Sequence, residues 1–379
     1  MSRGYVRELD SMLSLVRQGS GLSQAVVQGL DLREVHFAWE ELKCDGTVFL
    51  GCRFPEGINV EFLMERGATV VPAFPDLPYN PFRPRLYSRA ELMDGWAPGR
   101  DESTDKKIYE HFQTHGRDSP GVLESLSQRL HDHAIDDALR DLLEGRTEGD
   151  GAKRVVGIMG GHKTPRSDPY YRKVARIARE LTRSGYFITT GGGPGIMEAA
   201  NLGAFLAGVS EEELEEALGI LSAAPVYTDE GYMQCAQQVL DMFRHGSSSL
   251  AVPTWFYGHE PSNLFSVHIA KYFSNSLRED GLLAIALHGV IFAPGSAGTT
   301  QEVFQDATQN HYATYGVISP MVFLGRQHFG EKTLIYDCLR RQAEGKDYDD
   351  YLCLAENEDE VVDFIGSNPP GNQNGKKGG

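Results

Sequence analysis

The sequence predicts an α/β protein in which a doubly wound parallel sheet carries helices on both faces, preceded by a smaller N-terminal α+β domain. From residue 154 onward, short apolar runs alternate with stretches whose apolar residues recur at helical spacing. This alternation is typical of a parallel sheet covered by helices. In addition, two glycine-rich runs, residues 190–195 (TGGGPG) and 294–299 (PGSAGT), each follow an apolar run and precede a helical pattern.

Residues 1–150 lack this alternation, and we expect them to form a separate α+β domain whose role the sequence does not give. Its expected pieces are an amphipathic helix at residues 7–17, short β-prone pieces at 35–54, a proline-rich stretch at 72–84 and mostly helix at 108–143. No internal repeat is found, although residues 30–37 (LDLREVHF) resemble one rung of a β-solenoid. The predicted boundary lies near residue 150.

The second domain is predicted to span residues 151–365. Its strands are expected at residues 154–159, 186–190, 249–253, 288–293 and 320–324, and the fifth is expected to be the last. Its helices are expected around residues 171–181, 196–203, 303–307 and 334–339. An insertion at about residues 209–247 contains an acidic run (EEELEE, 211–216), which is typical of a solvated helix face. Residues 366–379 have nothing to bury and are predicted to be a disordered tail.

The composition excludes several classes of protein. The chain has 379 residues, of which 41% are apolar, as in soluble globular proteins. Its net charge of −17 argues against a nucleic-acid polymer as partner, because such binding needs clustered Lys and Arg. No stretch approaches the roughly 20 apolar residues that span a bilayer, so we expect no membrane partner and a cytoplasmic location. The 5 cysteines form no CxxC pair and the 12 histidines are scattered, so reduced thiols and no metal site are expected.

The two glycine runs are the strongest functional signal. At a strand-to-helix junction, free backbone N–H groups and the helix dipole attract anions, and glycine lets the backbone approach a phosphate. The alternative for either run alone is a tight turn that allows close helix–strand packing. Two such loops in one sheet can meet where the strand order reverses, which predicts a shared phosphate site.

Familiar nucleotide motifs are absent. A dinucleotide-binding domain has GxGxxG after its first strand and an acidic residue at the end of its second. Here the first turn reads MGGHK (159–163), the triple glycine follows the second expected strand, and that strand ends in Thr189 and Thr190. GxxxxGK[ST] is also absent. We therefore expect neither NAD binding nor ATP hydrolysis, and no cofactor.

Residues 191–200 (GGGPGIMEAA) and 294–302 (PGSAGTTQE) resemble the GGGxxGxM and PGGxGTxxE motifs of the LOG family. This family comprises cytokinin-activating phosphoribohydrolases and bacterial nucleotide 5′-monophosphate nucleosidases with a Rossmann-like fold. The resemblance covers about residues 154–324. It implies a homo-oligomer that hydrolyses the N-glycosidic bond of nucleoside 5′-monophosphates, releasing free base and ribose 5-phosphate.

Glu302 matches the motif glutamate. The resemblance implies that it stabilises oxocarbenium-like charge on the ribose or activates water. The alternative is that Thr299 and Glu302 form a capping box that closes a helix N-terminus.

Arg278 is similarly placed to an arginine that contacts phosphate or the departing base in the family. The alternative is a surface arginine paired with Glu279 or Asp280. The chain departs from the family at Glu279, where lysine is usual, and at Ser296, which replaces the second glycine of PGG.

Further residues are expected to bind the phosphate or nucleotide. They are Gly160, Gly191, Gly192, Gly193, Gly195, Gly295, Ser296, Gly298, Thr299 and Lys271. Lys271, Asn275 and Arg278 would share one face if their stretch is helical. The aromatic residues of segment 254–261 (TWFYGHEP) would either stack on a base or pack in the core.

Two other functions stay open in the sequence. One is a non-catalytic carrier of a phosphorylated ligand, because the same superfamily includes molybdenum-cofactor carriers. The other is a nucleotide sensor whose output is the N-terminal domain. The preferred base cannot be deduced from the sequence, because discrimination depends on the shape of the pocket.

Overall fold

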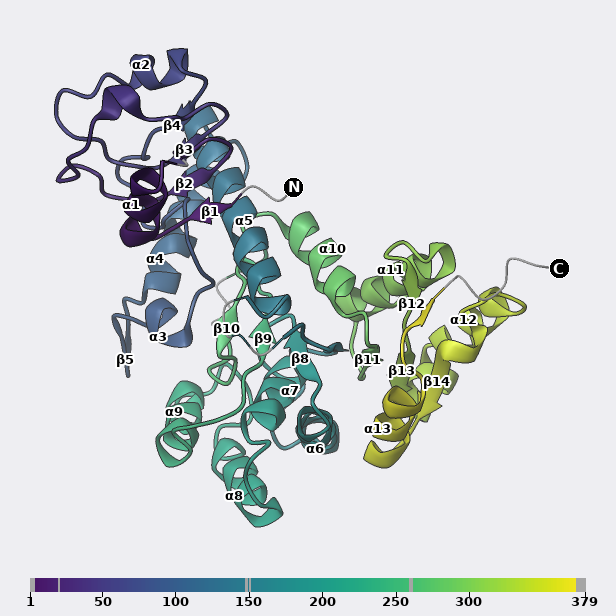
Figure 1. Cartoon of the computed structure of the whole chain (residues 1–379). Helices are drawn as coiled ribbons and strands as arrows, with labels where there is room; N and C mark the ends of the chain where they lie inside the picture. Colours follow the sequence, from purple (N-terminus) through teal and green to yellow (C-terminus); the bar gives the residue numbers. More distant parts are fainter. Residues whose placement is uncertain (1–3, 20, 147–148, 150, 259–261, 373–379) are drawn as a thin grey trace. The chain divides into compact units, whose positions relative to one another are not determined.

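The computed structural model describes residues 4–19, 21–146, 149, 151–258 and 262–372. Contacts between residues divide the chain into two compact units (Figure 1). Residues 1–86 and 110–141 form the first unit, and residues 87–109 and 142–379 form the second. Residues 87–109, which the sequence analysis assigned to the N-terminal domain, therefore pack with the large sheet of the second unit.

The first unit contains a four-stranded parallel sheet whose spatial order, β1-β2-β3-β4, is also the sequence order. Its elements are β1 (Tyr5–Val6), α1 (Leu9–Arg17), β2 (Val26–Gln28), η1 (Trp39–Glu41), β3 (Val48–Leu50), α2 (Val60–Glu65) and β4 (Thr69–Val71). Successive strands align Tyr5 with Val26, Val26 with Val48, and Val48 with Thr69, so one short strand recurs at nearly constant spacing.

This spacing is an internal repeat, so the prediction that the N-terminal region has none was wrong. Gln24, Gly46 and Gly67 stand at equivalent places before β2, β3 and β4, and all have left-handed backbone, with φ of 62°, 65° and 87°. Val27 and Phe49 are aligned and both fully buried. The repeat escaped notice because it lies in backbone conformation and burial, while the residues themselves differ from coil to coil.

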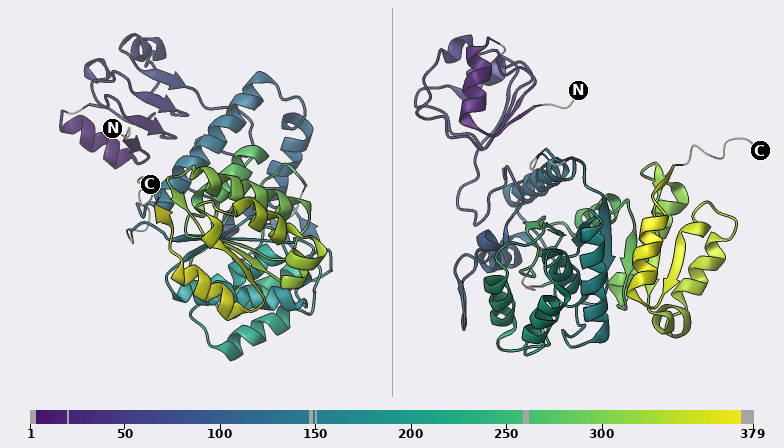
Figure 2. Two further views of the ribbon diagram at one scale, coloured as in Figure 1. Left: turned by 90° about the vertical axis from the view of Figure 1, so that its right-hand side faces the viewer. Right: turned by 60° about the horizontal axis from the view of Figure 1, so that its bottom comes forward.

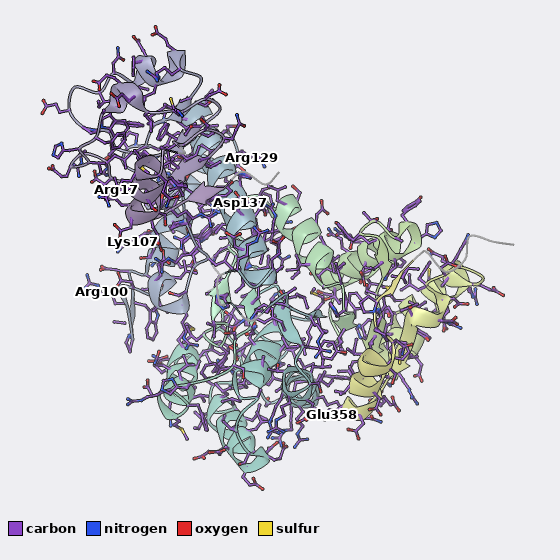
Figure 3. All side chains as sticks on the ribbon, viewed as in Figure 1. Arg17, Arg100, Lys107, Arg129, Asp137 and Glu358 are labelled. Atoms are coloured by element: carbon purple, nitrogen blue, oxygen red, sulfur yellow. The ribbon has the colours of Figure 1, made fainter. Side chains whose placement is uncertain are left out.

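A long helix completes the first unit. This helix is α5 (Val122–Leu143), which follows α4 (Thr104–His111) and a wide helical turn, η2 (Phe112–Gly116), and most of α4 belongs to the second unit. Side chains of the β1 region bond to α5: the Tyr5 hydroxyl donates to Asp137, which Figure 3 labels, and Arg7 donates to Asp141 at 2.6 Å. Arg140 also pairs with Asp137, at 2.9 Å. These polar contacts join the helix to the first strand of the repeat.

The second unit is built on a seven-stranded sheet in the order β10-β9-β8-β7-β11-β13-β14, and all its pairs are parallel. The strands are β7 (Val155–Met159), β8 (Phe187–Thr190), β9 (Leu250–Ala251), β10 (His268–Ile269), β11 (Val290–Phe292), β13 (Met321–Leu324) and β14 (Leu352–Ala355). The strand order reverses at β7: β8, β9 and β10 follow one another on one side of it, and β11, β13 and β14 follow one another on the other. The predicted doubly wound, Rossmann-like sheet is confirmed. The prediction that the strand at 320–324 is the last was wrong, because β14 pairs with it.

Helices cover both faces of this sheet (Figure 2). α6 (Pro169–Arg183), α7 (Ile196–Phe205) and α13 (Glu358–Ser367) pack together on one face, and their apolar residues form the main core with β7 and β8. α10 (Asn275–Ile285), α11 (Ala297–Tyr312) and α12 (Ile335–Ala343) form the layer on the other face.

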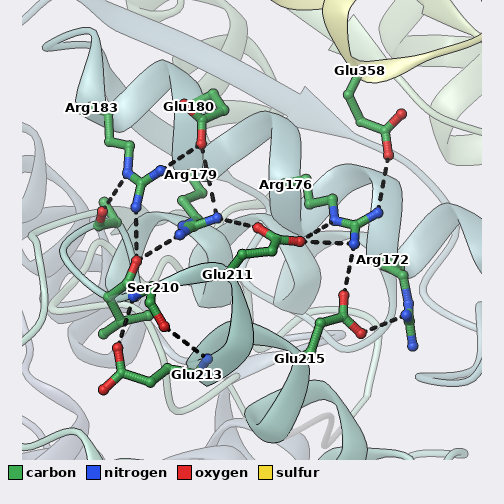
Figure 4. Close-up of polar contacts among 12 residues, drawn as sticks. Arg172, Arg176, Arg179, Glu180, Arg183, Ser210, Glu211, Glu213, Glu215 and Glu358 are labelled. Atoms are coloured by element: carbon green, nitrogen blue, oxygen red, sulfur yellow. Dashed lines mark hydrogen bonds and ion pairs between the residues drawn. The ribbon is translucent and has the colours of Figure 1, made fainter.

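The insertion contains α8 (Glu211–Leu221) and α9 (Tyr232–Met242). Ser210 and Glu213 close the start of α8 with a capping box. The sequence analysis predicted that the acidic run of α8 is a solvated helix face. The structure shows that two of its glutamates form ion pairs instead. Glu211 pairs with Arg176 and Arg179 of α6, and Glu215 pairs with Arg172 and Arg176 (Figure 4). The run therefore holds α8 against α6, although each exposed pair adds only about 0–1 kcal/mol.

The remaining elements are short. They are α3 (Arg89–Leu92), β5 (Trp96–Ala97), β6 (Arg100–Asp101), β12 (Val317–Ile318), η3 (Gln327–Lys332), η4 (Asp349–Tyr351) and β15 (Gly371–Asn372). Within the predicted tail, residues 366 and 367 end α13, and β15 pairs with β12. Residues 373–379 lie outside the described residues. Among the described residues, no helix combines the length and the apolar character that crossing a membrane requires.

Candidate functional site

Three loops meet at the carboxyl edge of the large sheet. They follow β8, β7 and β11, which are neighbours in the sheet. The backbone N–H of Gly161, in the loop after β7, donates to the carbonyl of Pro294 at 3.0 Å, and the N–H of Ile196 donates to the carbonyl of Gly161 at 3.2 Å. The loop after β7 therefore touches both glycine runs. The two runs lie at one edge of the sheet, at the reversal of strand order where ligands bind in such folds.

The glycines allow these loops to approach one another. At Gly195, where φ is +69°, a Cβ atom would lie 2.8 Å from the carbonyl oxygen of His162. At Gly160 a Cβ would lie 2.7 Å from the Ile196 side chain, and at Gly295 it would lie 2.7 Å from Cβ of Thr299. Real Cβ atoms do not approach so closely, so any side chain at these positions would push the loops apart.

Two helices begin at this junction without help from a side chain. α7 starts after Gly195 and α11 starts after Ser296, and neither N-cap residue has a side-chain capping hydrogen bond. Their first N–H groups and their dipoles point toward the loops, an arrangement that attracts an anion. Thr299 is the third residue of α11 rather than its N-cap, so the alternative of a capping box with Glu302 does not apply.

Asn263 holds the first glycine run in place. Its Nδ2 donates to the carbonyls of Gly192 at 3.1 Å and Gly193 at 3.3 Å, and also to Oδ1 of Asn201 at 2.9 Å. Thr190 donates to the same Oδ1 at 2.7 Å. The sequence analysis missed both asparagines, because a single asparagine between loop residues carries no local signal of such a contact.

A buried ion pair fixes α7 beneath the loops. The guanidinium of Arg166 bonds both carboxylate oxygens of Glu198, at 2.7 and 2.9 Å. The hydroxyls of Tyr171 and Tyr232 donate to the same carboxylate, at 2.6 and 2.7 Å. Glu198 lies within the first motif, but all its bonds go to side chains of the fold. Its role is therefore to position α7.

Arg278 reaches the first glycine run. It lies on α10, and its Nε donates to the carbonyl of Val252 at 2.7 Å. Its Nη2 occupies the space that a Cβ of Gly191 would need. Among the described residues, no ion pair joins Arg278 to Glu279 or Asp280, which instead accept hydrogen bonds from Gln301 and Gln305. Arg278 therefore packs against the first glycine run and does not form the surface pair of the alternative, and its contact with a ligand stays a prediction.

Glu302 lies within electrostatic reach of this arginine. Burial raises the pKa of its carboxyl to about 7, the positive charge of Arg278 opposes the rise, and the negative charge of Glu279 adds to it. At neutral pH the group is therefore present in both protonation states, and it can either accept or donate a proton. The structure brings Glu302, Arg278 and both glycine runs together.

Lys271 lies elsewhere. α10 begins at Asn275, so Lys271 is not on this helix and does not share a face with Arg278. Its side chain is buried, and its Nζ pairs with Asp105 of α4 at 2.8 Å. Nε1 of Trp255 donates to the same carboxylate, also at 2.8 Å. The Lys271 ammonium is thus held in a buried ion pair within the fold. The sequence did not indicate this pair, because Asp105 lies far from Lys271 in the chain.

The aromatic segment after β9 divides into buried and exposed parts. Trp255 is buried beside Asp105, as the packing alternative expects. Tyr257 is 67% exposed, and its hydroxyl donates to Glu279 at 3.3 Å. Residues 259–261 of this segment lie outside the described residues.

Comparison with known proteins finds a family model that matches part of the second unit. The model of the SLOG cluster4 family matches residues 153–224, which run from β7 through the first glycine run into the insertion. This match supports a place in the wider SLOG superfamily. It does not single out the LOG family. No curated protein matches the chain.

Two solved structures are similar over 57% of this chain. One is the molybdenum cofactor binding protein from the phototrophic bacterium Rippkaea orientalis, with 13% identity, 96% of that chain covered and a TM-score of 0.38. The other is the Moco carrier protein from Chlamydomonas reinhardtii, with 14% identity, 96% of that chain covered and a TM-score of 0.35.

Proposed function

We propose that this protein binds a nucleoside 5′-monophosphate and hydrolyses its N-glycosidic bond, releasing free base and ribose 5-phosphate. The observation that carries the proposal is the meeting of the two glycine runs across Gly161, with Arg278 against the first run and Glu302 within reach of Arg278. A phosphate fits the N–H groups at the starts of α7 and α11, because these have no capping side chains.

The chemistry follows from charge. As the bond between C1′ and the base nitrogen breaks, positive charge develops on the ribose, and a carboxylate beside it lowers the barrier. Water then forms the new bond to C1′. One water proton passes to Glu302, which returns it to the departing base, so the products are the neutral base and ribose 5-phosphate and Glu302 is regenerated. A carboxyl with a pKa of about 7 can serve in both protonation states at neutral pH.

One observation favours a second function, binding without hydrolysis. Glu279 adds a negative charge beside Glu302, where the LOG family usually has lysine, and this charge helps to keep Glu302 protonated. A protonated Glu302 cannot stabilise a cation, so such a site would hold a phosphorylated ligand as a carrier or sensor does.

A panel of substrates separates the two. The full chain is incubated with AMP, GMP, IMP, CMP and UMP, and free base and ribose 5-phosphate are measured by chromatography. The matching nucleosides, which lack phosphate, are the control. We expect base release from monophosphates and at least 100-fold slower release from nucleosides, because the phosphate anchors the ligand. Binding without release would support the carrier or sensor, and equal rates for nucleosides and nucleotides would contradict the phosphate site.

A further inference from the structure

Three polar side chains gather around Glu279. The hydroxyl of Tyr257 donates to its Oε1 at 3.3 Å, and Nε2 of Gln301 donates to its Oε2 at 2.8 Å. Nδ2 of Asn275 donates to the Tyr257 hydroxyl at 2.9 Å. We call Tyr257, Asn275, Glu279 and Gln301 the Glu279 cluster. Its members come from the loop after β9, from α10 and from α11, so three elements hold one carboxylate in place.

The cluster borders the candidate site. Glu279 follows Arg278 on α10, and Gln301 precedes Glu302 on α11. The charges of both Arg278 and Glu279 act on the Glu302 carboxyl. Tyr257 is largely exposed, and Glu279 is partly exposed. A ligand whose phosphate lies at the helix N-termini can therefore extend its other end toward this cluster.

The chemistry of the Glu279 cluster determines which groups it would bind at the end of the ligand opposite the phosphate. An ionised carboxylate only accepts hydrogen bonds, and each oxygen of Glu279 has accepted one, which leaves lone pairs free. Such a group attracts N–H donors strongly and repels oxygen lone pairs. Lysine, the usual residue here in the LOG family, would have the opposite preference.

We propose that the Glu279 cluster recognises the nucleobase, and that it selects bases with an exocyclic amino group over bases with a keto oxygen at the same place. This inference rests on the proposed function for the position of the phosphate. The hydrogen bonds from Tyr257 and Gln301 orient the carboxylate, so the preference needs no movement of the cluster.

Matched ligands test the inference. AMP and IMP differ in an amino or keto group at one ring position, and so do CMP and UMP. Dissociation constants are measured by calorimetry with the full chain, together with rates of base release. We expect the amino member of at least one pair to bind at least tenfold more tightly, which is the effect of one charge-assisted hydrogen bond.

Two variants and a control locate the preference. Glu279→Gln keeps the size of the side chain and removes its charge, so the ratio of affinities should fall to within about threefold. Glu279→Lys should reverse the preference, because an ammonium donates to a keto oxygen. Asp280→Asn is the matched control: it removes an adjacent acid that bonds to Gln305 instead, and the ratio should not change.

The outcomes distinguish this inference from the proposed function. Discrimination of amino from keto ligands without base release would keep the inference and reject hydrolysis. Base release with equal affinities for both members of each pair would overturn the inference alone. A Glu279→Gln variant that retains the wild-type ratio would also overturn it, and so would the absence of binding by all four nucleotides, which would reject the proposed function as well.

Discussion

The chain contains two parallel sheets that differ in one topological respect. In the first unit, β1 to β4 lie in the order in which the chain makes them, and each coil places its strand beside the previous one. In the second unit, chain progress reverses at β7, so β8 and β11 flank it. At this reversal, loops from distant parts of the chain meet. Parallel pairing alone does not make a ligand site, whereas a reversal of strand order brings separate loops to one place.

Glycine serves the two sheets differently. In the first unit, Gly46 and Gly67 supply left-handed turns at the same step of successive coils. In the second, Gly161, Gly195 and Gly295 let three loops touch. The same residue type therefore maintains a repeat in one sheet and lets loops come into contact in the other. The following predictions test whether function resides only at the reversal.

The largest expected effect is that of Glu302→Gln. Removing the charge while keeping the shape should lower base release about 1,000-fold, as loss of a key electrostatic group does. The midpoint of thermal unfolding should not fall, because Glu302 does not cap α11. Steady-state kinetics and thermal unfolding give the two values. Glu216→Gln, a change at an exposed residue of α8, is the matched control. Full activity of Glu302→Gln would show that the carboxylate of Glu302 takes no part in the reaction.

Next in size is Gly192→Ala. Gly192 has φ of +80°, and a Cβ there would lie 2.8 Å from Cβ of Ala251 and 3.1 Å from Pro253. The combined strain and clash should lower the free energy of unfolding by about 2–4 kcal/mol and weaken ligand binding. Urea denaturation and calorimetry measure these changes.

The matched control for that change is Gly57→Ala in the first unit. Gly57 has φ of +91° but no neighbour within 4 Å of an added Cβ. The backbone strain alone should lower the free energy of unfolding by about 1 kcal/mol and leave binding unchanged. Equal losses at the two glycines would show that close approach of the loops adds nothing at the reversal.

Asp306 predicts an effect of pH. Burial raises the pKa of this carboxyl from 3.8 to about 8, and its Oδ2 has no hydrogen-bond partner among the described residues. The folded protein thus holds a proton that the unfolded chain releases near pH 3.8, so wild-type stability should fall as pH rises toward 8 and then level off. Asp306→Asn cannot ionise.

Urea denaturation at pH 6 and pH 9 measures this effect. The free energy of unfolding of Asp306→Asn relative to wild type should rise by about 2–3 kcal/mol between these two values. Asp347→Asn, at an exposed aspartate, is the matched control. An equal difference at both pH values would mean that Asp306 is already ionised at pH 6.

The smallest effect belongs to the repeat. Gln24 occupies the place of Gly46 and Gly67 with φ of 62°, which is strained for a residue with a side chain. Gln24→Gly should raise the free energy of unfolding by about 0.5–1 kcal/mol in urea denaturation. Gln18→Gly, at a C-cap with φ of −74°, should lower it by a similar amount. A loss at both positions would contradict the equivalence of the three turns.

The sequence predicted the large sheet because its strands are apolar runs next to strong punctuation. All residues of β7 are buried, and it is followed directly by glycine. β14 was missed since only its end residues, Leu352 and Ala355, are buried, and acidic residues precede it. The four N-terminal strands have two or three residues each, too few for a period to show in the sequence.

The candidate site was predictable where its residues are local to a motif. The glycines follow strands directly, and Glu302 lies near the start of α11, the helix that follows the second glycine run, so their positions depend mainly on the fold. Asn263 and Lys271 depend on partners far away in the chain, Gly192 in one case and Asp105 in the other. Neither contact leaves a pattern within a window of neighbouring residues, so one was missed and the other was assigned to the ligand.

The pairing of Lys271 with Asp105 has a consequence for anyone who would isolate the large sheet. Asp105 belongs to residues 87–109, which pack with that sheet. The next residues in the chain, 110–141, belong to the first unit again. A fragment that starts at residue 151 would leave an ammonium sealed in the interior with its counter-ion deleted, a defect of about 3–5 kcal/mol. Each unit receives two separate stretches of the polypeptide, so no single cut yields either of them whole.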